Sequence, residues 1–235
     1  MLYMQKMSRI FSILKRHRHD SLLLLLAAHL ILIPACKPDR KVDSASVRDE
    51  IASREPKKVT ESDILAHAAV VGGDIAAQAR TVISGNLMAA QIEGGLEYAI
   101  GFCNLKASPI VDSLQEKYGA EIRRVTFKVR NPADRPDEIE AQILEAYTEA
   151  IANGQVMADH VQILDDNQVL FARPITIDNA LCLSCHGTPG QELSADAQAL
   201  IRKYYPDDEA VGYQIGELRG MWSIRLQKKN LVAAL

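Results

Sequence analysis

The chain is organised around Cys182-Leu183-Ser184-Cys185-His186, near the start of its last quarter. Two thiols separated by two residues can each add across a vinyl group of one haem, and the histidine that follows can then bind the iron as proximal ligand. A CxxC pair also occurs in redox dithiols, usually beside a βαβ pattern, and in zinc sites, which need a second ligand pair. The sequence contains no second CxxC. The stretch therefore predicts one covalent haem c, attached through Cys182 and Cys185 with His186 on the iron.

The N-terminus predicts export. Residues 1–20 contain five Lys and Arg and one acid, and an apolar run of twelve residues, 22–33, interrupted only by His29, follows. A membrane span takes about 20 residues, so this run is short for a span but suits the core of a signal peptide. It ends in Ile33-Pro34-Ala35-Cys36, which resembles a bacterial lipobox. We expect a lipoprotein signal peptide over residues 1–35 and a lipid on Cys36; an ordinary cleaved signal or an uncleaved anchor is the alternative.

Removal of this leader would leave an acidic protein of 200 residues. The leader holds five of the 27 Lys and Arg and one of the 30 Asp and Glu, so the mature net charge would be −7. That charge argues against nucleic acid or anionic lipid as a partner. Residues 36–59 are rich in charge and lack apolar periodicity, which predicts a flexible tether. Residues 60–235 are enough for one domain, which we expect on the periplasmic side of a membrane.

Helices dominate the first part of this domain. Apolar residues at helical spacing predict helices over residues 60–88, 89–103 and 110–118. Thr60 is the expected N-cap of the first helix, with Asp63 completing a capping box. Pro109 is expected to place a helix end near Cys103, because a proline disfavours helical geometry in the residue before it. Gly72-Gly73 lacks the strand and third glycine of a nucleotide loop, so close helix packing is its interpretation.

The second part of the domain predicts an antiparallel sheet. Strands are expected over residues 121–130, 156–164, 169–175 and 216–226, with a helix capped by Asp137 over residues 138–152. Residues 165–168 between the middle strands are a hairpin signal. Helices followed by a sheet that one helix interrupts make an α+β domain.

Four stretches of the chain resemble single-haem c-type proteins with a PAS-like fold. Members of this family are free-standing exported proteins or the sensing part of bacterial histidine kinases. The similar stretches lie at residues 99–104 (Ala-Ile-Gly-Phe-Cys-Asn), 128–132 (Lys-Val-Arg-Asn-Pro, with Pro136-Asp137 downstream), 182–187 and 216–220. The resemblance implies a PAS-like antiparallel sheet that carries the haem. It also implies histidine/cysteine axial ligation, with Cys103 as the distal ligand. Unlike the sensor members, this sequence ends at Leu235 without a coiled-coil exit or a kinase region.

The residues alone leave the sixth iron ligand open. Cys103 is the only cysteine left once lipid and thioethers are assigned, so it is either a small buried apolar residue or a ligand. The alternatives are an open position or one of His67, His160, Met88, Met157 and Met221. Together with the resemblance, we expect Cys103.

Several charged residues have two interpretations. Arg130, Asn131 and Arg173 could hold the haem propionates or be solvated loop and strand-edge residues. The acidic run Asp207-Asp208-Glu209 is most simply a solvated turn.

We expect an electron carrier that works with a redox partner protein while its lipid holds it at a membrane. The alternative is a haem-based gas or redox sensor that signals through a separate partner protein. A peroxidase would need an open distal site with positioned acid–base residues, and the sequence shows no distal His-Arg pair at recognisable spacing. We therefore do not expect an enzyme.

Overall fold

The computed structural model describes residues 43–54 and 58–235. These residues form two units that divide between Lys57 and Lys58. The first unit contains α2 (Ser44–Arg54), whose residues 44–53 are all exposed. The segment predicted as a flexible tether thus includes a helix. The sequence did not indicate this helix, because the segment lacks apolar periodicity. The leader and Cys36 lie outside the described residues, and within the described ranges no helix is long and apolar enough to cross a membrane.

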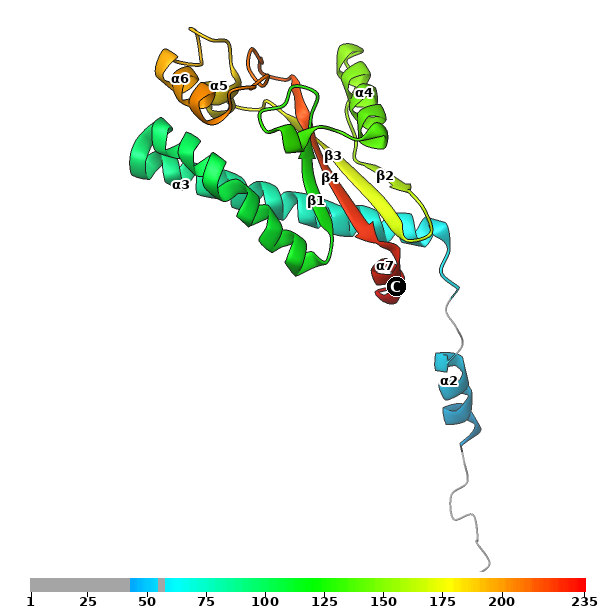
Figure 1. Cartoon of the computed structure of the whole chain (residues 1–235). Coiled ribbons are helices and arrows are strands. Elements are labelled where there is room, and N and C mark those ends of the chain that lie inside the picture. The colour runs from blue at the N-terminus through cyan, green and yellow to red at the C-terminus, as the bar shows by residue number, and fades with distance from the viewer. Residues whose placement is uncertain (1–42, 55–57) are drawn as a thin grey trace, which may run out of the picture. The chain divides into compact units, whose positions relative to one another are not determined.

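The second unit begins with α3 (Glu61–Tyr118). Its start is as predicted, because the Thr60 side chain accepts from the Asp63 N–H and the Asp63 carboxylate accepts from the Thr60 N–H. At Gly94 and Gly95 the backbone leaves helical geometry, with Gly95 at φ 71°. The two glycines divide α3 into a first arm and a second arm, and the chain reverses between them (Figure 1).

The helix end predicted near Cys103 is wrong. The backbone stays helical through Pro109 and ends at Gly119, in left-handed geometry with φ 57°. A proline inside a helix costs about 3 kcal/mol, and packing of the second arm offsets this cost. Leu114 is buried in the core formed with the first arm, and Lys117 donates to Gln78 of the first arm at 2.9 Å. Tertiary packing therefore overrides the local preference.

Four strands form one antiparallel sheet in the order β1-β4-β3-β2. The strands are β1 (Glu121–Val125), β2 (His160–Ile163), β3 (Gln168–Thr176) and β4 (Leu218–Gln227). Each coincides with a predicted strand, although β1 and β2 are shorter than expected. Together with α3, the sheet confirms the α+β class.

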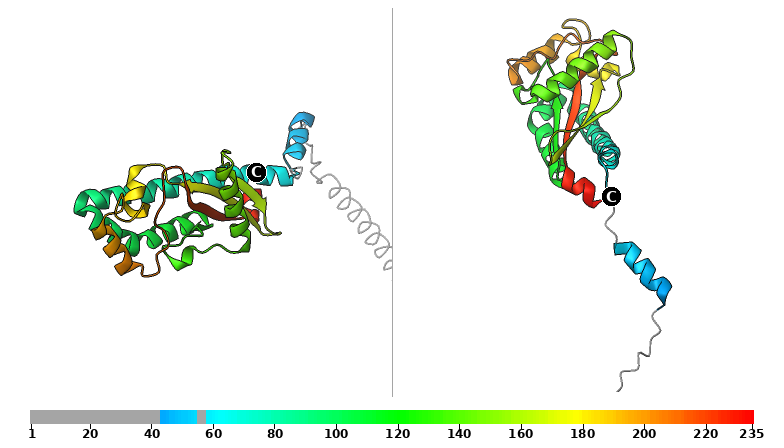
Figure 2. Two further views of the ribbon diagram at one scale, coloured as in Figure 1. Left: turned by 90° about the horizontal axis from the view of Figure 1, so that it is seen from above. Right: turned by 90° about the vertical axis from the view of Figure 1, so that its right-hand side faces the viewer.

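Helices cover both faces of the sheet (Figure 2). The first arm of α3 packs on one face, where Ile75 meets Phe171 in the main core. At Gly72 an added Cβ would lie 2.3 Å from the Phe171 ring, which confirms that this glycine permits close helix packing. The other face is covered by α4 (Glu138–Ala152), which Asp137 caps as predicted and which buries Leu144 against Leu170.

The remaining elements are short. They are the 3-10 helix η1 (Pro132–Asp134), α5 (Ala180–His186), α6 (Ala195–Tyr204) and α7 (Lys228–Ala233). Neither α6 nor α7 was predicted; α6 turns one side, including Ala197 and Ile201, into the core. In Figure 1, α5 and α6 lie at the end of the sheet where β4 begins, near the second arm of α3.

Candidate functional site

Helix α5 carries the CxxCH stretch. Asn179 caps its start by accepting from the Cys182 N–H at 3.3 Å, and Gly187 ends it by donating to the Leu183 carbonyl at 2.8 Å. Cys182 and Cys185 are three residues apart on this helix, so they lie on one side of it. Both are free thiols and half-buried. This arrangement allows both sulfurs to reach the edge of one planar group.

The two thiols border different apolar clusters. Cys185 packs against a cluster that includes Ile100 of the second arm of α3 and Ile201 of α6. Cys182 packs against a smaller cluster that includes Ile177 and Tyr213. Burial raises the pKa of the Cys185 thiol, which keeps it protonated at neutral pH. Each thiol therefore borders an apolar cluster that suits the body of a porphyrin, and the Cys182 sulfur also lies 3.7 Å from an Asp178 carboxylate oxygen.

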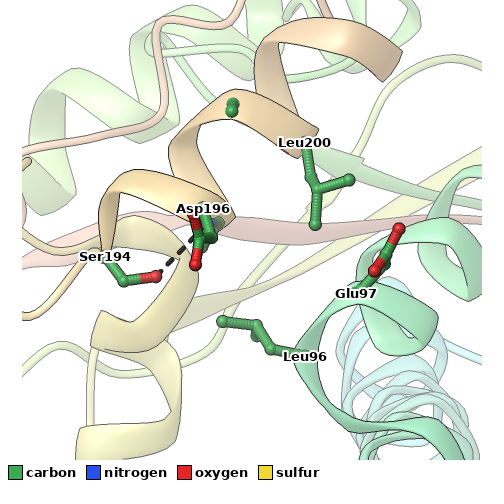
Figure 3. A pocket seen from close by; sticks show the side chains of 7 residues that line it. Leu96, Glu97, Ser194, Asp196 and Leu200 are labelled. Atoms are coloured by element: carbon green, nitrogen blue, oxygen red, sulfur yellow. Dashed lines mark hydrogen bonds between the residues drawn. The ribbon is translucent and has the colours of Figure 1, made fainter.

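A cavity of about 530 Å³ opens between the second arm of α3 and α6 (Figure 3). Its apolar wall includes Leu96, Ala197 and Leu200, which also belong to or pack on the cluster that borders Cys185. Glu97 of α3 and Asp196 of α6 also line it, from opposite walls. The cavity therefore shares its apolar wall with the cluster that borders Cys185.

His186 is held in one orientation. Its Nδ1 lies 2.8 Å from the Ala210 carbonyl oxygen, and its ring meets the Tyr213 ring edge-on, with centroids 6.2 Å apart. A carbonyl only accepts, so Nδ1 carries the proton and Nε2 keeps a free lone pair. Burial, reinforced by the positive charges of Arg219 and Arg130, holds the pKa of His186 well below its usual value. The imidazole is thus neutral at physiological pH and available to a metal through Nε2.

Arg130 fastens α5 to the rest of the domain. Its Nε and Nη2 donate to the two carboxylate oxygens of Asp208 at 3.0 and 3.1 Å. Nη2 also donates to the carbonyls of Cys185 at 2.7 Å and Ala210 at 3.2 Å. The side chain of Asp208 is only 5 % exposed, so the predicted solvated acidic turn is wrong at this residue. Arg130 is neither a solvated charge nor free for a propionate.

The other two residues considered for propionates also have protein partners. Arg173 donates to the Asp159 carboxylate at 2.8 and 2.6 Å and to the Gly73 carbonyl at 3.0 Å. The Asn131 side chain accepts from the Ala133 N–H at 3.1 Å and caps η1. Both side chains therefore serve the fold.

The candidates for the sixth ligand lie in different parts of the domain. Met221 is fully buried in the core beneath α4, and Met157 packs on the same cluster, which differs from those around the thiols. His160 lies in β2 with Nε2 2.9 Å from the Gln162 side-chain oxygen, and Met88 is 47 % exposed. His67 is half-buried on the first arm of α3. Cys103 lies in the second arm of α3, but its side chain is outside what the structure describes.

Sequence reasoning missed three residues that surround His186. The Lys128 ammonium lies 4.3 Å from the centre of the Tyr213 ring, and the Arg219 guanidinium carbon lies 5.6 Å from it. In the sequence, Lys128 and Arg219 belong to two of the stretches that carry the family resemblance. Neither residue is part of a recognised binding motif. They lie next to Tyr213 only because the fold places segments that are distant in the sequence side by side. In the described ranges, no three His, Cys, Asp or Glu side chains group as a metal site.

The fold and the site define an α+β protein with a CxxCH helix packed at one end of an antiparallel sheet. The chain belongs to the Tll0287-like family, whose sequence model matches residues 44–227 and so spans all four stretches of the predicted resemblance. It is similar to the solved structure of the cyanobacterial heme-protein Tll0287, with 24 % identity and a TM-score of 0.43. That match covers 63 % of this chain and 91 % of the other. No curated protein matches the chain.

We expect Arg130→Met to destabilise the protein by about 3–5 kcal/mol, because it leaves the buried Asp208 carboxylate without its partner. Denaturant unfolding followed by circular dichroism measures this loss. The matched control is Arg135→Met, which breaks a 3.7 Å pair with Glu209 whose side chains are 61 % and 50 % exposed. It should cost about 1 kcal/mol or less. Equal losses in the two variants would contradict the role given to Arg130.

Proposed function

We propose that this chain is a c-type haem protein that transfers electrons, with one haem attached through Cys182 and Cys185 and ligated by His186. The observation that carries the proposal is the Nδ1 contact of His186 with the Ala210 carbonyl, which leaves Nε2 for iron directly after two free, half-buried thiols. The family takes its name from a protein described as a heme-protein, which agrees with this assignment. Bound haem supplies the one-electron couple between ferric and ferrous iron.

The chain's own residues orient and shield the group. The Ala210 carbonyl fixes the imidazole tautomer and plane, and Arg130 holds the helix that carries both thiols. The aromatic ring of Tyr213, 5 % exposed, limits access of water to one side of His186. A PAS-like description of the sheet belongs to the same proposal and is supported by its four antiparallel strands with helices on both faces.

The distal ligand in this proposal is Cys103. The resemblance implies it, and its backbone lies in the second arm of α3, whose Ile100 and Leu96 border the cluster around Cys185. A thiolate stabilises ferric iron and lowers the reduction potential relative to methionine ligation.

The setting of the protein is proposed from its N-terminus. A lipid on Cys36 would hold residues 60–235 at a membrane on the periplasmic side, with residues 36–59 as the tether. In this role the chain acts on no substrate of its own; it exchanges electrons with a redox partner protein, and nucleic acid is not a partner.

A sensor remains a second candidate because of the kink in α3. Gly94 and Gly95 depart from helical geometry between the first arm, which packs on the sheet, and the second arm, which contains Cys103. Loss of a Cys103–iron contact would release the part of the second arm next to this kink, while Leu114 would keep its far end in the core. A separate signalling protein could respond to such a local change.

The covalent attachment is tested by co-expression with a c-type maturation system. The denatured protein should retain haem on a gel stained for peroxidase activity, and acid acetone should not extract it. Cys182→Ala and Cys185→Ala should each leave at most one thioether, which the spectrum of the pyridine complex reports. Extraction of the haem from the wild-type protein would show the assignment to be wrong.

Cys103→Ala is expected to change the ferric spectrum from thiolate-ligated low-spin to high-spin or water-ligated, and to raise the midpoint potential. The reason is that an anionic donor favours ferric iron. Electron paramagnetic resonance and a redox titration measure both effects. Met88→Ala, in an exposed side chain of the first arm, is the control. If Cys103→Ala leaves spectrum and potential as they were, Cys103 is a packing residue and the sensor candidate loses its switch.

Cys36 should become the mature N-terminus and carry lipid. The wild-type protein should then fractionate with membranes, and labelling with a radioactive fatty acid should disappear in Cys36→Ala. Mass spectrometry that finds an intact leader, or labelling that persists in the variant, would exclude lipidation at this residue.

A further inference from the structure

Arg219, at the start of β4, lies beside the proposed iron ligand without a carboxylate partner. Its guanidinium carbon is 5.6 Å from the centre of the Tyr213 ring, and that ring in turn contacts His186. Its Nη1 donates to the Lys128 carbonyl at 3.3 Å. Across residues 43–54 and 58–235, no salt bridge joins Arg219 to an acid. Its remaining donors are therefore available to an acceptor that the protein does not itself supply.

Other cations gather around the same residues. The Lys128 ammonium lies 4.3 Å from the centre of the Tyr213 ring. It donates one hydrogen bond to the Val211 carbonyl, so two of its three N–H donors remain for another acceptor. Arg124 in β1 is close enough to act on His186 by its charge. Arg130 is neutralised by Asp208.

The acidic side chains near these cations do not balance their positive charge. Asp134 is the carboxylate whose charge acts on Arg219, and burial raises the pKa of Asp134 in spite of Arg124 and Arg219. Three cations, Arg124, Lys128 and Arg219, thus gather here with one acid, Asp134, whose pKa burial raises. A half-buried excess of positive charge is costly unless an anion accompanies it.

We propose that Arg219, assisted by Lys128 and Arg124, binds the haem propionates and positions the porphyrin against His186. The inference rests on the proposed function, since haem is the group that brings two carboxylates to this place. The planar fork of Arg219 suits bidentate binding of a carboxylate, and its positive charge acts on His186. Arg130 and Arg173, which the sequence suggested for this task, already have their own acceptors.

The test compares Arg219→Gln with the wild-type holoprotein. Loss of the positive charge should lower the midpoint potential, because a nearby cation favours the electron-rich ferrous state and neutralises a propionate. The propionate bending band in the resonance Raman spectrum should shift as well. Arg219→Lys keeps the charge but not the fork, so it should restore most of the potential while the Raman band stays shifted.

The matched control is Arg173→Gln, in the neighbouring strand β3, whose guanidinium pairs with Asp159. It should leave potential and propionate band unchanged. Lys128→Gln should move the potential in the same direction as Arg219→Gln by a smaller amount, and it decides the question if Arg219→Gln yields no holoprotein. Covalent haem with an unchanged potential and band in both variants overturns this inference alone. Wild-type protein without covalent haem overturns the proposed function instead.

Discussion

The guanidinium of Arg130 is the interaction on which the geometry of the site depends. Four hydrogen bonds from it join the segment after β1 to Asp208, to the end of α5 at Cys185 and to Ala210. Helix α5 has only seven residues and cannot hold its position by its own backbone bonds. Because the donors of a guanidinium point in fixed directions, one planar group sets both the place and the tilt of this helix relative to the sheet.

The same contacts orient His186. The Ala210 carbonyl accepts from both Arg130 and the His186 ring, and the Ala210 N–H donates to Asp208 at 3.0 Å. The Ala210 peptide, which orients the imidazole, is thus itself fixed by hydrogen bonds at both its carbonyl and its N–H. The backbone extends this clamp, since the Tyr213 N–H donates to the His186 carbonyl at 2.9 Å. Such outer contacts fix the tautomer and raise the basicity of a metal-binding histidine.

The sequence predicted the features that local chemistry determines. The caps at Thr60 and Asp137, the hairpin between β2 and β3 and the close packing at Gly72 each follow from a few neighbouring residues. The continuation of α3 through Pro109 did not, because burial of Leu114 in a distant core outweighs the local cost of proline. The pairing of Arg130 with Asp208 joins residues 78 positions apart, so no local pattern reveals it. The CxxCH stretch indicated the three residues on α5, whereas the surroundings of His186 depend on strands β1 and β4.

The distribution of charge links the bound group to the fold. The whole chain carries a net charge of −3, yet Arg124, Lys128 and Arg219 gather around His186 and Tyr213. Cations on an acidic protein would ordinarily pair with acids on its surface. Here the acid whose charge acts on Arg219 is Asp134, and burial raises the pKa of Asp134. Mutual repulsion of these cations opposes the folded state until an anion joins them. A dianionic group covalently fixed at Cys182 and Cys185 would remove that repulsion permanently, so its attachment would stabilise the same end of the sheet that Arg130 holds together.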